Sequence, residues 1–149
     1  MSDAPATSGV RLGVDVGTVR VGVAASDVSG VLATPLLTLP RAGSIDALVR
    51  LVDEHGAVQV VVGLPRSLSG RSGPAAQLAR QYAEELVEGL AERAVTVHMA
   101  DERLTTVIAS RNLSDRGLRG RRQRAVVDQA AAVLILQSWL DREGGGHGG

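Results

Sequence analysis

Residues 11–26 read RLGVDVGTVRVGVAAS, and this stretch decides how the fold begins. Val-rich runs precede and follow Gly17-Thr18, a pattern that predicts two antiparallel strands joined by a tight turn. Residues 32–39 form a third strand candidate, weakened by Pro35 because proline donates no backbone hydrogen bond. We therefore expect the chain to open with three consecutive strands.

Helical and strand patterns alternate after this point. Residues 44–54 have helical spacing with Ser44 as a candidate N-cap, and the apolar run 58–64 suits a strand buried on both faces. Pro74 begins a second helix, whose apolar stripe comprises Leu78, Tyr82, Leu86 and Leu90. The remaining candidates are a strand over 95–100, a helix over 105–113 and a long helix over 122–142. This order predicts an α/β fold with a mixed five-stranded sheet, three antiparallel strands followed by two parallel ones, flanked by helices.

The length and composition limit the kind of protein. With 149 residues, 44% of them hydrophobic, the chain suits one domain, expected over 10–142 between disordered tails at 1–9 and 143–149. No apolar run approaches the ~20 residues of a membrane span. The N-terminus lacks the pattern of a signal peptide and the chain has no cysteine. We expect a cytoplasmic protein that makes no membrane contact.

Several residue types are missing, and each exclusion removes a class of chemistry. The chain has no lysine, so all 16 basic residues are arginine, and Schiff-base or phosphate-loop lysine chemistry is excluded. The lack of cysteine excludes thiolate nucleophiles and thiolate zinc sites. Tyr82 and Trp139 are the only aromatic residues, which disfavours an aromatic platform for single-stranded nucleic acid.

Three carboxylates occur where solvated side chains are not expected. Asp15 and Glu102 each end an apolar strand, and Asp128 lies in an alanine-rich helix that can approach the sheet closely. Taken singly, Asp15 is more typical of a turn former, and the other two could pair with a neighbouring arginine. Three such positions at the ends of core elements favour a shared site, in which a hard cation, Mg²⁺ or Mn²⁺, offsets the mutual repulsion.

The Asp-x-Gly-Thr string at Asp15 occurs in two classes of enzyme. Actin-like ATPases and sugar kinases use it on phosphate and metal, but they need a second lobe for which 149 residues leave no room. The lack of lysine and of a second glycine-rich phosphate loop also counts against that class. The ribonuclease-H-like nucleases remain.

Four motifs resemble the YqgF (RuvX) family, in the order that the family has. They are GVDVGTVRVGVA at 13–24, VVGLP at 61–65, DERLTT at 101–106 and VDQAAA at 127–132 followed by ILQ at 135–137. The resemblance covers about residues 12–140. It implies a ribonuclease-H-like fold and a divalent-metal nuclease whose catalytic, metal-binding acids are Asp15, Glu102 and Asp128. Two ions held by these carboxylates would support hydrolysis that leaves 5′-phosphate and 3′-hydroxyl ends.

The resemblance implies two alternative roles, resolving Holliday junctions or trimming the precursor of 16S rRNA. Symmetric cleavage of a junction needs two active sites, so that role predicts a homodimer. The loop after Gly-Leu-Pro departs from the family pattern, reading RSLSG at 66–70, so a polar role of this loop carries over poorly. The competing hypothesis is a catalytically silent nucleic-acid-binding module that acts in ribosome assembly or transcription.

Clustered arginines point to nucleic acid, either branched DNA or precursor rRNA. Between residues 111 and 124 six arginines stand against Asp115, a net charge of +5, so the rest of the chain carries −5 within a formal total of zero. Arginine makes bidentate phosphate contacts, although a merely solvated basic loop would read the same. The expected nucleic-acid-binding residues are Thr18, Arg20, Arg66, Arg103, Arg119, Arg121, Arg122 and Arg124. His98 is expected to be structural or exposed, with assistance of product release as the alternative.

Overall fold

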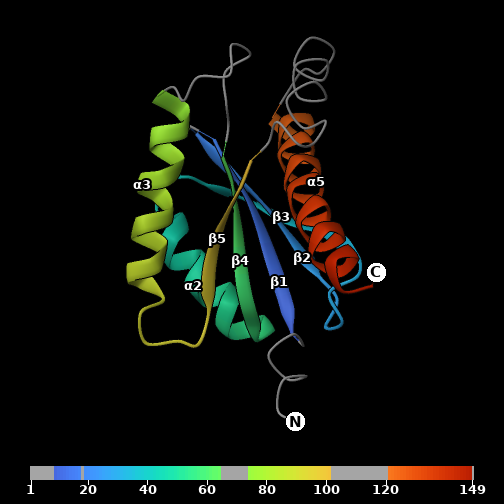
Figure 1. The fold of residues 1–149 in the computed structure, drawn as a ribbon. Helices are drawn as coiled ribbons and strands as arrows, with labels where there is room; N and C mark the ends of the chain where they lie inside the picture. The colour runs from blue at the N-terminus through green and yellow to red at the C-terminus, as the bar shows by residue number, and fades with distance from the viewer. Residues whose placement is uncertain (1–8, 18, 65–73, 102–120, 149) are drawn as a thin grey trace.

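The fold is one sheet between two helical layers (Figure 1). The computed structural model describes residues 9–17, 19–64, 74–101 and 121–148. The strands are β1 (Val10–Val16), β2 (Arg20–Ser26), β3 (Ala33–Pro40), β4 (Ala57–Leu64) and β5 (Thr96–Asp101). The described helices are α2 (Ser44–His55), α3 (Pro74–Gly89) and α5 (Arg121–Gly148). The helix predicted over 105–113 lies outside the described residues.

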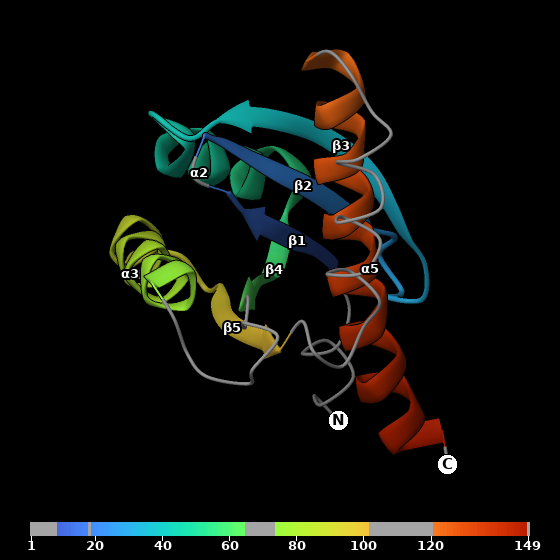
Figure 2. The same ribbon diagram turned by 90° about the horizontal axis from the view of Figure 1, so that it is seen from above.

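The strand order β3-β2-β1-β4-β5 confirms the predicted mixed sheet. β1 pairs with β2 and β2 with β3 in antiparallel fashion, whereas β1 pairs with β4 and β4 with β5 in parallel. The parallel pairs need crossover connections, and α2 and α3 provide layers on one face. Seen from above, α5 crosses the opposite face (Figure 2). None of the described helices is both long enough and apolar enough to cross a membrane.

β3 lies at one edge of the sheet, which is where its proline is tolerated. The register between β2 and β3 shifts after Val23, which pairs with Leu37, whereas the next residue, Ala24, pairs with Pro35. A bulge at an edge strand accommodates a residue that cannot donate to the ladder. The strand that Pro35 weakens is therefore formed, in the position where the missing N–H costs least.

Two buried clusters occupy the two faces of the sheet. The larger lies under α2 and α3 and contains leucines and valines, among them Leu12, Val14 and Leu86, together with Tyr82. The smaller lies under α5 and contains many alanines together with the fully buried Leu136. Alternation along the strands sends neighbouring side chains into different clusters.

Two details of the helices differ from the sequence prediction. The N-cap of α2 is Gly43, with φ of 77°, and Ser44 is the first helical residue. A left-handed φ favours glycine, so the helix begins one residue earlier than a serine cap would require. In α3, Tyr82 is buried as predicted, but Leu78 is 37% exposed and Ala79 is buried instead. Four residues are slightly more than one helical turn, so a stripe of residues spaced by four rotates around the helix. Its first member, Leu78, therefore turns away from the sheet.

The structure describes part of each terminal segment. α5 extends to Gly148, beyond its predicted end at residue 142 and over most of the segment 143–149. Glycine costs a helix about 1 kcal/mol, but each residue added to an existing helix gains a backbone hydrogen bond. At the other end of the chain Gly9 is the one residue of the segment 1–9 that the structure describes, and its N–H donates to the carbonyl of Val28, in the connection between β2 and β3, at 2.8 Å.

Candidate active site

Asp15 is the one predicted acid whose side chain the structure describes. It is 4% exposed and lies near the carboxyl end of β1. Val14 and Val16 on either side of it pack into the α2/α3 cluster, so Asp15 lies on the face that α5 covers. Burial disfavours a charged carboxylate unless it is compensated by hydrogen bonds or a cation, and such positions are therefore candidates for function.

Small residues flank Asp15 in the sheet. Asp15 pairs with Gly22 of β2, and Gly22 pairs with Thr38 of β3. We call Asp15, Gly22 and Thr38 the site row. On the other side the register of β1 and β4, extended by one residue, brings Asp15 beside Gly63, which pairs with Ala100 of β5. A glycine on each side leaves the carboxylate without bulky neighbours in the sheet.

The backbone of α5 touches the sheet at Gly13, two residues before Asp15. A Cβ atom at Gly13 would lie 2.6 Å from Cβ of Leu136 and 2.9 Å from the carbonyl oxygen of Ala132. Only glycine permits such an approach of helix to strand. The expectation that small residues let this helix approach the sheet closely is therefore confirmed.

Two side-chain hydrogen bonds fix the direction and the level of α5. The N–H of Ala33 donates to Oε1 of Gln137 at 2.9 Å, and Nε2 of Gln129 donates to Oγ1 of Thr38 at 3.0 Å. The earlier residue of β3 contacts the later residue of α5, so α5 runs antiparallel to β3. β1 runs in the same direction as β3, because both are antiparallel to β2, and α5 is therefore antiparallel to β1 as well. Gln129 therefore lies at the level of the site row, and the backbone of Asp128 precedes it in the helix.

Arg20 lies at the margin of the same site. It begins β2 two residues before Gly22, and alternation places the two on the same face of the sheet. The N–H of Gly17 donates to the carbonyl oxygen of Arg20 at 2.9 Å, which closes the turn between β1 and β2. A predicted nucleic-acid-binding residue thus stands beside the end of the strand that carries Asp15.

The other predicted site residues are described in part or not at all. β5 ends at Asp101, and these residues lie outside the described part of the chain: Thr18, Arg66, Glu102, Arg103 and Arg119. Arg121, Arg122 and Arg124 lie in the first turns of α5, where the structure describes the backbone. Among the described side chains, no three His, Cys, Asp or Glu residues gather where they could hold a metal ion. Asp15 is the one predicted acid among those side chains.

His98 makes its described contacts away from the site row. On β5, its Nε2 lies 2.9 Å from Oγ1 of Thr96, and its ring centroid lies 4.9 Å from that of Trp139. Trp139 packs against the cluster under α5. The role of His98 stays a prediction.

The sequence matches a known protein family. The model of the RuvX family, described as Holliday junction resolvase, matches residues 9–142. The chain belongs to the RuvX family. Membership makes it a nuclease, an enzyme that hydrolyses phosphodiester bonds. The resemblance stated from four motifs is therefore confirmed.

Relatives in the RuvX family are similar along almost the whole chain. One from Frankia casuarinae is 57% identical over 140 residues, covering 91% of this chain and 68% of the relative. Another from Mycobacterium ulcerans is 56% identical over 137 residues, covering 90% of this chain and 79% of the relative. Both carry the name "Putative pre-16S rRNA nuclease".

Solved structures confirm the predicted ribonuclease-H-like fold. RuvC of Thermus thermophilus in complex with a Holliday junction substrate has a TM-score of 0.58 at 18% identity, covering 92% of this chain and 96% of that one. A second Thermus thermophilus RuvC structure has a TM-score of 0.54 at 16% identity, covering 91% and 96%. At this identity the likeness shows the fold alone.

Sequence reasoning missed Thr38 and Gln129. Thr38 lies in a strand candidate without a chemical signature, and only the pairing of β3 with β2 brings it into the site row. Gln129 stands next to Asp128 in the family motif, which was the available signal. Its hydrogen bond to Thr38 depends on the tertiary packing of α5, which spacing along the chain does not reveal.

Proposed function

We propose that this RuvX-family nuclease depends on a divalent metal and cleaves the precursor of 16S rRNA, with Asp15, Glu102 and Asp128 as its catalytic acids. The observation that carries the proposal is the carboxylate of Asp15, which is 4% exposed beside Gly22 and under the layer formed by α5. A buried acid in such a place is stable when a cation compensates its charge.

Strand alternation supports Glu102. His98 contacts Trp139 of α5, and Ala100 packs in the cluster under α5, so even-numbered positions of β5 belong to the face of Asp15. Glu102 is the next even-numbered position in the sequence. A strand continued by one residue would bring this carboxylate to the side of the sheet where Asp15 lies.

Helical spacing supports Asp128. Positions 128, 132 and 136 are separated by one turn each, and the last two are the positions that contact Gly13 of β1. Because α5 runs antiparallel to β1, moving back one turn from Ala132 leads toward Asp15. The hydrogen bond of the adjacent Gln129 to Thr38 sets the same level.

This donor set fits Mg²⁺ or Mn²⁺. Three carboxylates offer only hard oxygen ligands, and the chain has no cysteine that would select a softer metal. Such ions, when bound, activate water and stabilise the leaving oxygen in phosphodiester hydrolysis. The protein contributes a strand that holds Asp15 rigidly, and the guanidinium of Arg20 and the basic stretch 111–124 would neutralise phosphates.

Precursor rRNA is favoured as the substrate by the degree of similarity. The relatives named for pre-16S rRNA are 57% and 56% identical to this chain, whereas RuvC is 18% identical. A backbone-reading basic surface is also compatible with structured RNA, since the chain has one Trp, one Tyr and no Phe for stacking on bases.

A side-by-side digestion tests the proposal. Wild type, Asp15→Asn and Asp53→Asn are incubated with a precursor rRNA leader, a linear duplex and a four-way DNA junction, with Mg²⁺ or Mn²⁺. Asp53 is the matched control, because it pairs with Arg93 on the surface, away from the site row. We expect the wild type to cleave the leader preferentially and Asp53→Asn to retain full activity. Asp15→Asn should lose more than about 100-fold, beyond the 10–100-fold typical of outer-shell changes.

Each contrary result has a distinct meaning. Near wild-type cleavage by Asp15→Asn contradicts the set of three acids. Preference for the four-way junction replaces the rRNA substrate with a recombination substrate. A wild type that binds the leader without cleaving it, with either metal, supports the silent binding module instead.

A further inference from the structure

Arg41, in the connection between β3 and α2, donates two hydrogen bonds to the turn that follows Asp15. Its backbone N–H donates to the carbonyl oxygen of Val19 at 2.8 Å, and its Nη1 donates to the carbonyl oxygen of Gly17 at 2.9 Å. Gly17 in turn donates its N–H to the carbonyl oxygen of Arg20. One residue from a different connection therefore holds two carbonyl groups of the turn between β1 and β2.

Arg41 is itself anchored in the helical layer on the other face of the sheet. Its guanidinium carbon lies 5.3 Å from the ring centroid of Tyr82, within the range of a cation–π contact. Its carbonyl oxygen accepts a hydrogen bond from Oγ of Ser44 at 2.8 Å, and that Oγ lies 2.6 Å from the hydroxyl of Tyr82. Ser44 and Tyr82 are 1% and 3% exposed, so the anchor is buried in the helical layer.

The anchor does not change charge near neutral pH. Burial raises the pKa of Tyr82 above its usual value, so the phenol keeps its proton and can serve in the hydrogen bond with Ser44. A continuous series of contacts then leads from Tyr82 through Ser44 and Arg41 to Gly17. It ends two residues after Asp15.

We propose that Arg41 is a positioning residue for cleavage, which holds the β1–β2 turn so that Asp15 keeps the orientation that the reaction needs. This inference rests on the proposed function of Asp15. Arg41 acts through the carbonyl groups of Gly17 and Val19. Removing its guanidinium therefore lowers kcat and leaves KM for RNA almost unchanged.

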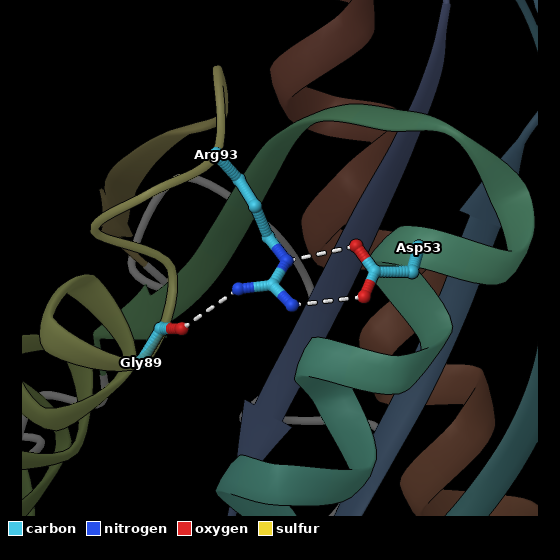
Figure 3. A network of polar contacts seen from close by, with 3 residues as sticks. All are labelled: Asp53, Gly89 and Arg93. Atoms are coloured by element: carbon cyan, nitrogen blue, oxygen red, sulfur yellow. Dashed lines mark hydrogen bonds and ion pairs between the residues drawn. The ribbon is translucent and has the colours of Figure 1, made fainter.

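Arg93 provides a matched control within the same chain. Its Nε and Nη2 lie 2.8 Å and 2.9 Å from the carboxylate oxygens of Asp53, and its Nη1 donates to the carbonyl oxygen of Gly89 at 3.4 Å (Figure 3). Like Arg41, it joins two elements and binds a backbone carbonyl. Arg93, however, lies just after α3 and joins this region to the carboxyl-terminal end of α2. Both helices lead into the amino ends of β4 and β5, which lie at the opposite end of the strands from Asp15.

The first readout needs neither metal nor substrate. Amide hydrogen exchange at Gly17 is measured by NMR in the full-length wild type, Arg41→Met and Arg93→Met. Methionine keeps an unbranched stem and removes the guanidinium donors. We expect Gly17 to exchange about tenfold faster in Arg41→Met, the effect of losing one hydrogen bond from a charged donor, and at the wild-type rate in Arg93→Met. Unchanged exchange in Arg41→Met, or equal acceleration in both variants, overturns the proposal.

The second readout is steady-state cleavage at a temperature where circular dichroism shows every variant folded. We expect Arg41→Met to lose about tenfold in kcat with KM within about twofold of wild type. Arg41→Lys, which keeps a cationic donor, recovers part of kcat, and Arg93→Met retains wild-type kinetics. A raised KM with unchanged kcat would make Arg41 a phosphate contact and overturn the positioning role.

Failure of this inference is distinguishable from failure of the proposed function. An active wild type whose kinetics Arg41→Met leaves unchanged overturns the positioning role alone. A wild type that does not cleave overturns the proposed function and with it the role of Arg41 in cleavage.

Discussion

The two faces of the sheet are built from side chains of different size. Under α2 and α3, Leu12, Val14 and Leu86 are fully buried within a thick aliphatic layer. Under α5, the backbone of the helix rests on Gly13, and alanines such as Ala132 fill the contact. Large side chains hold a helix away from a sheet, whereas small ones let the two backbones meet.

Buried polarity follows the same division. Among the described residues, the buried polar or charged side chains are Arg11, Asp15, Ser26 and Ser44. The first three lie on the α5 face by strand alternation, and Ser44 belongs to α2. One face therefore carries the larger aliphatic cluster, while the other combines small residues with buried polar groups under a closely packed helix.

The largest expected effect on stability is on the aliphatic face. Leu86→Ala removes a fully buried side chain from α3, and such truncations cost about 2–5 kcal/mol through lost burial and a residual cavity. Urea unfolding measures the loss. Cleavage per folded molecule should remain at the wild-type value, and a loss of kcat in fully folded protein would contradict the division of labour between the faces.

Gly13→Ala tests the opposite face with a single added methyl group. Its Cβ would meet Leu136 at 2.6 Å and the carbonyl oxygen of Ala132 at 2.9 Å, so α5 must shift. Overpacking of this kind costs about 1–3 kcal/mol. We expect less destabilisation than in Leu86→Ala but a clear fall in kcat of the folded protein. If kcat is retained while stability falls, the close approach of α5 has no part in the site.

Thr38→Val removes one hydroxyl from the site row with little change in volume. The amide of Gln129 loses its partner, at a cost of about 1 kcal/mol, and α5 loses a contact that sets its level. We expect a small fall in the unfolding midpoint and a weaker apparent affinity for Mn²⁺ in cleavage. Thr38→Ser, which keeps the hydroxyl, is the control and should restore the affinity.

The smallest effect is expected at Asp27, in the connection between β2 and β3. The N–H of Leu32, the hydroxyl of Ser29 and the N–H of Val31 lower the pKa of Asp27 well below its usual value. Because the folded-state pKa is lowered, the stabilisation is fully present above about pH 4 and is lost as the pH falls further. The difference in melting temperature between wild type and Asp27→Ala should therefore shrink below about pH 4, with kcat unaffected at pH 7. A difference that grows on acidification would contradict this sign.

The sequence predicts the sheet well because its signals are local. The Val-rich runs around Gly17 and the continuous run of β4 each define a strand, and their order admits few topologies. Small errors occur where one backbone angle or the helix phase decides, as at Gly43, which caps α2 in place of Ser44. The spacing of apolar residues does not reveal which residue of a polar connection takes a positive φ angle, as Gly43 does.

The site is less accessible to sequence reasoning. Asp15 stands out because an acid in an apolar strand is unusual, and Asp128 stands out for the same reason in its helix. Arg41 carries no comparable signal, since its partners Gly17 and Tyr82 are distant in sequence and meet it only after the layers assemble. A residue such as Arg41 is recognised only from its tertiary contacts, whereas the candidate acids are recognised from the apolar residues that flank them in the sequence.

Direct titration of Mn²⁺ tests the central proposal, that Asp15, Glu102 and Asp128 form one metal site. Calorimetry is performed on folded wild type, Asp15→Asn, Glu102→Gln, Asp128→Asn and the control Asp53→Asn. We predict that each of the first three variants weakens Mn²⁺ binding by more than about 100-fold, beyond the roughly 10–100-fold typical of losing a residue that only supports a ligand, and that Asp53→Asn binds as wild type does. Wild-type affinity in any one of these three variants would contradict the claim.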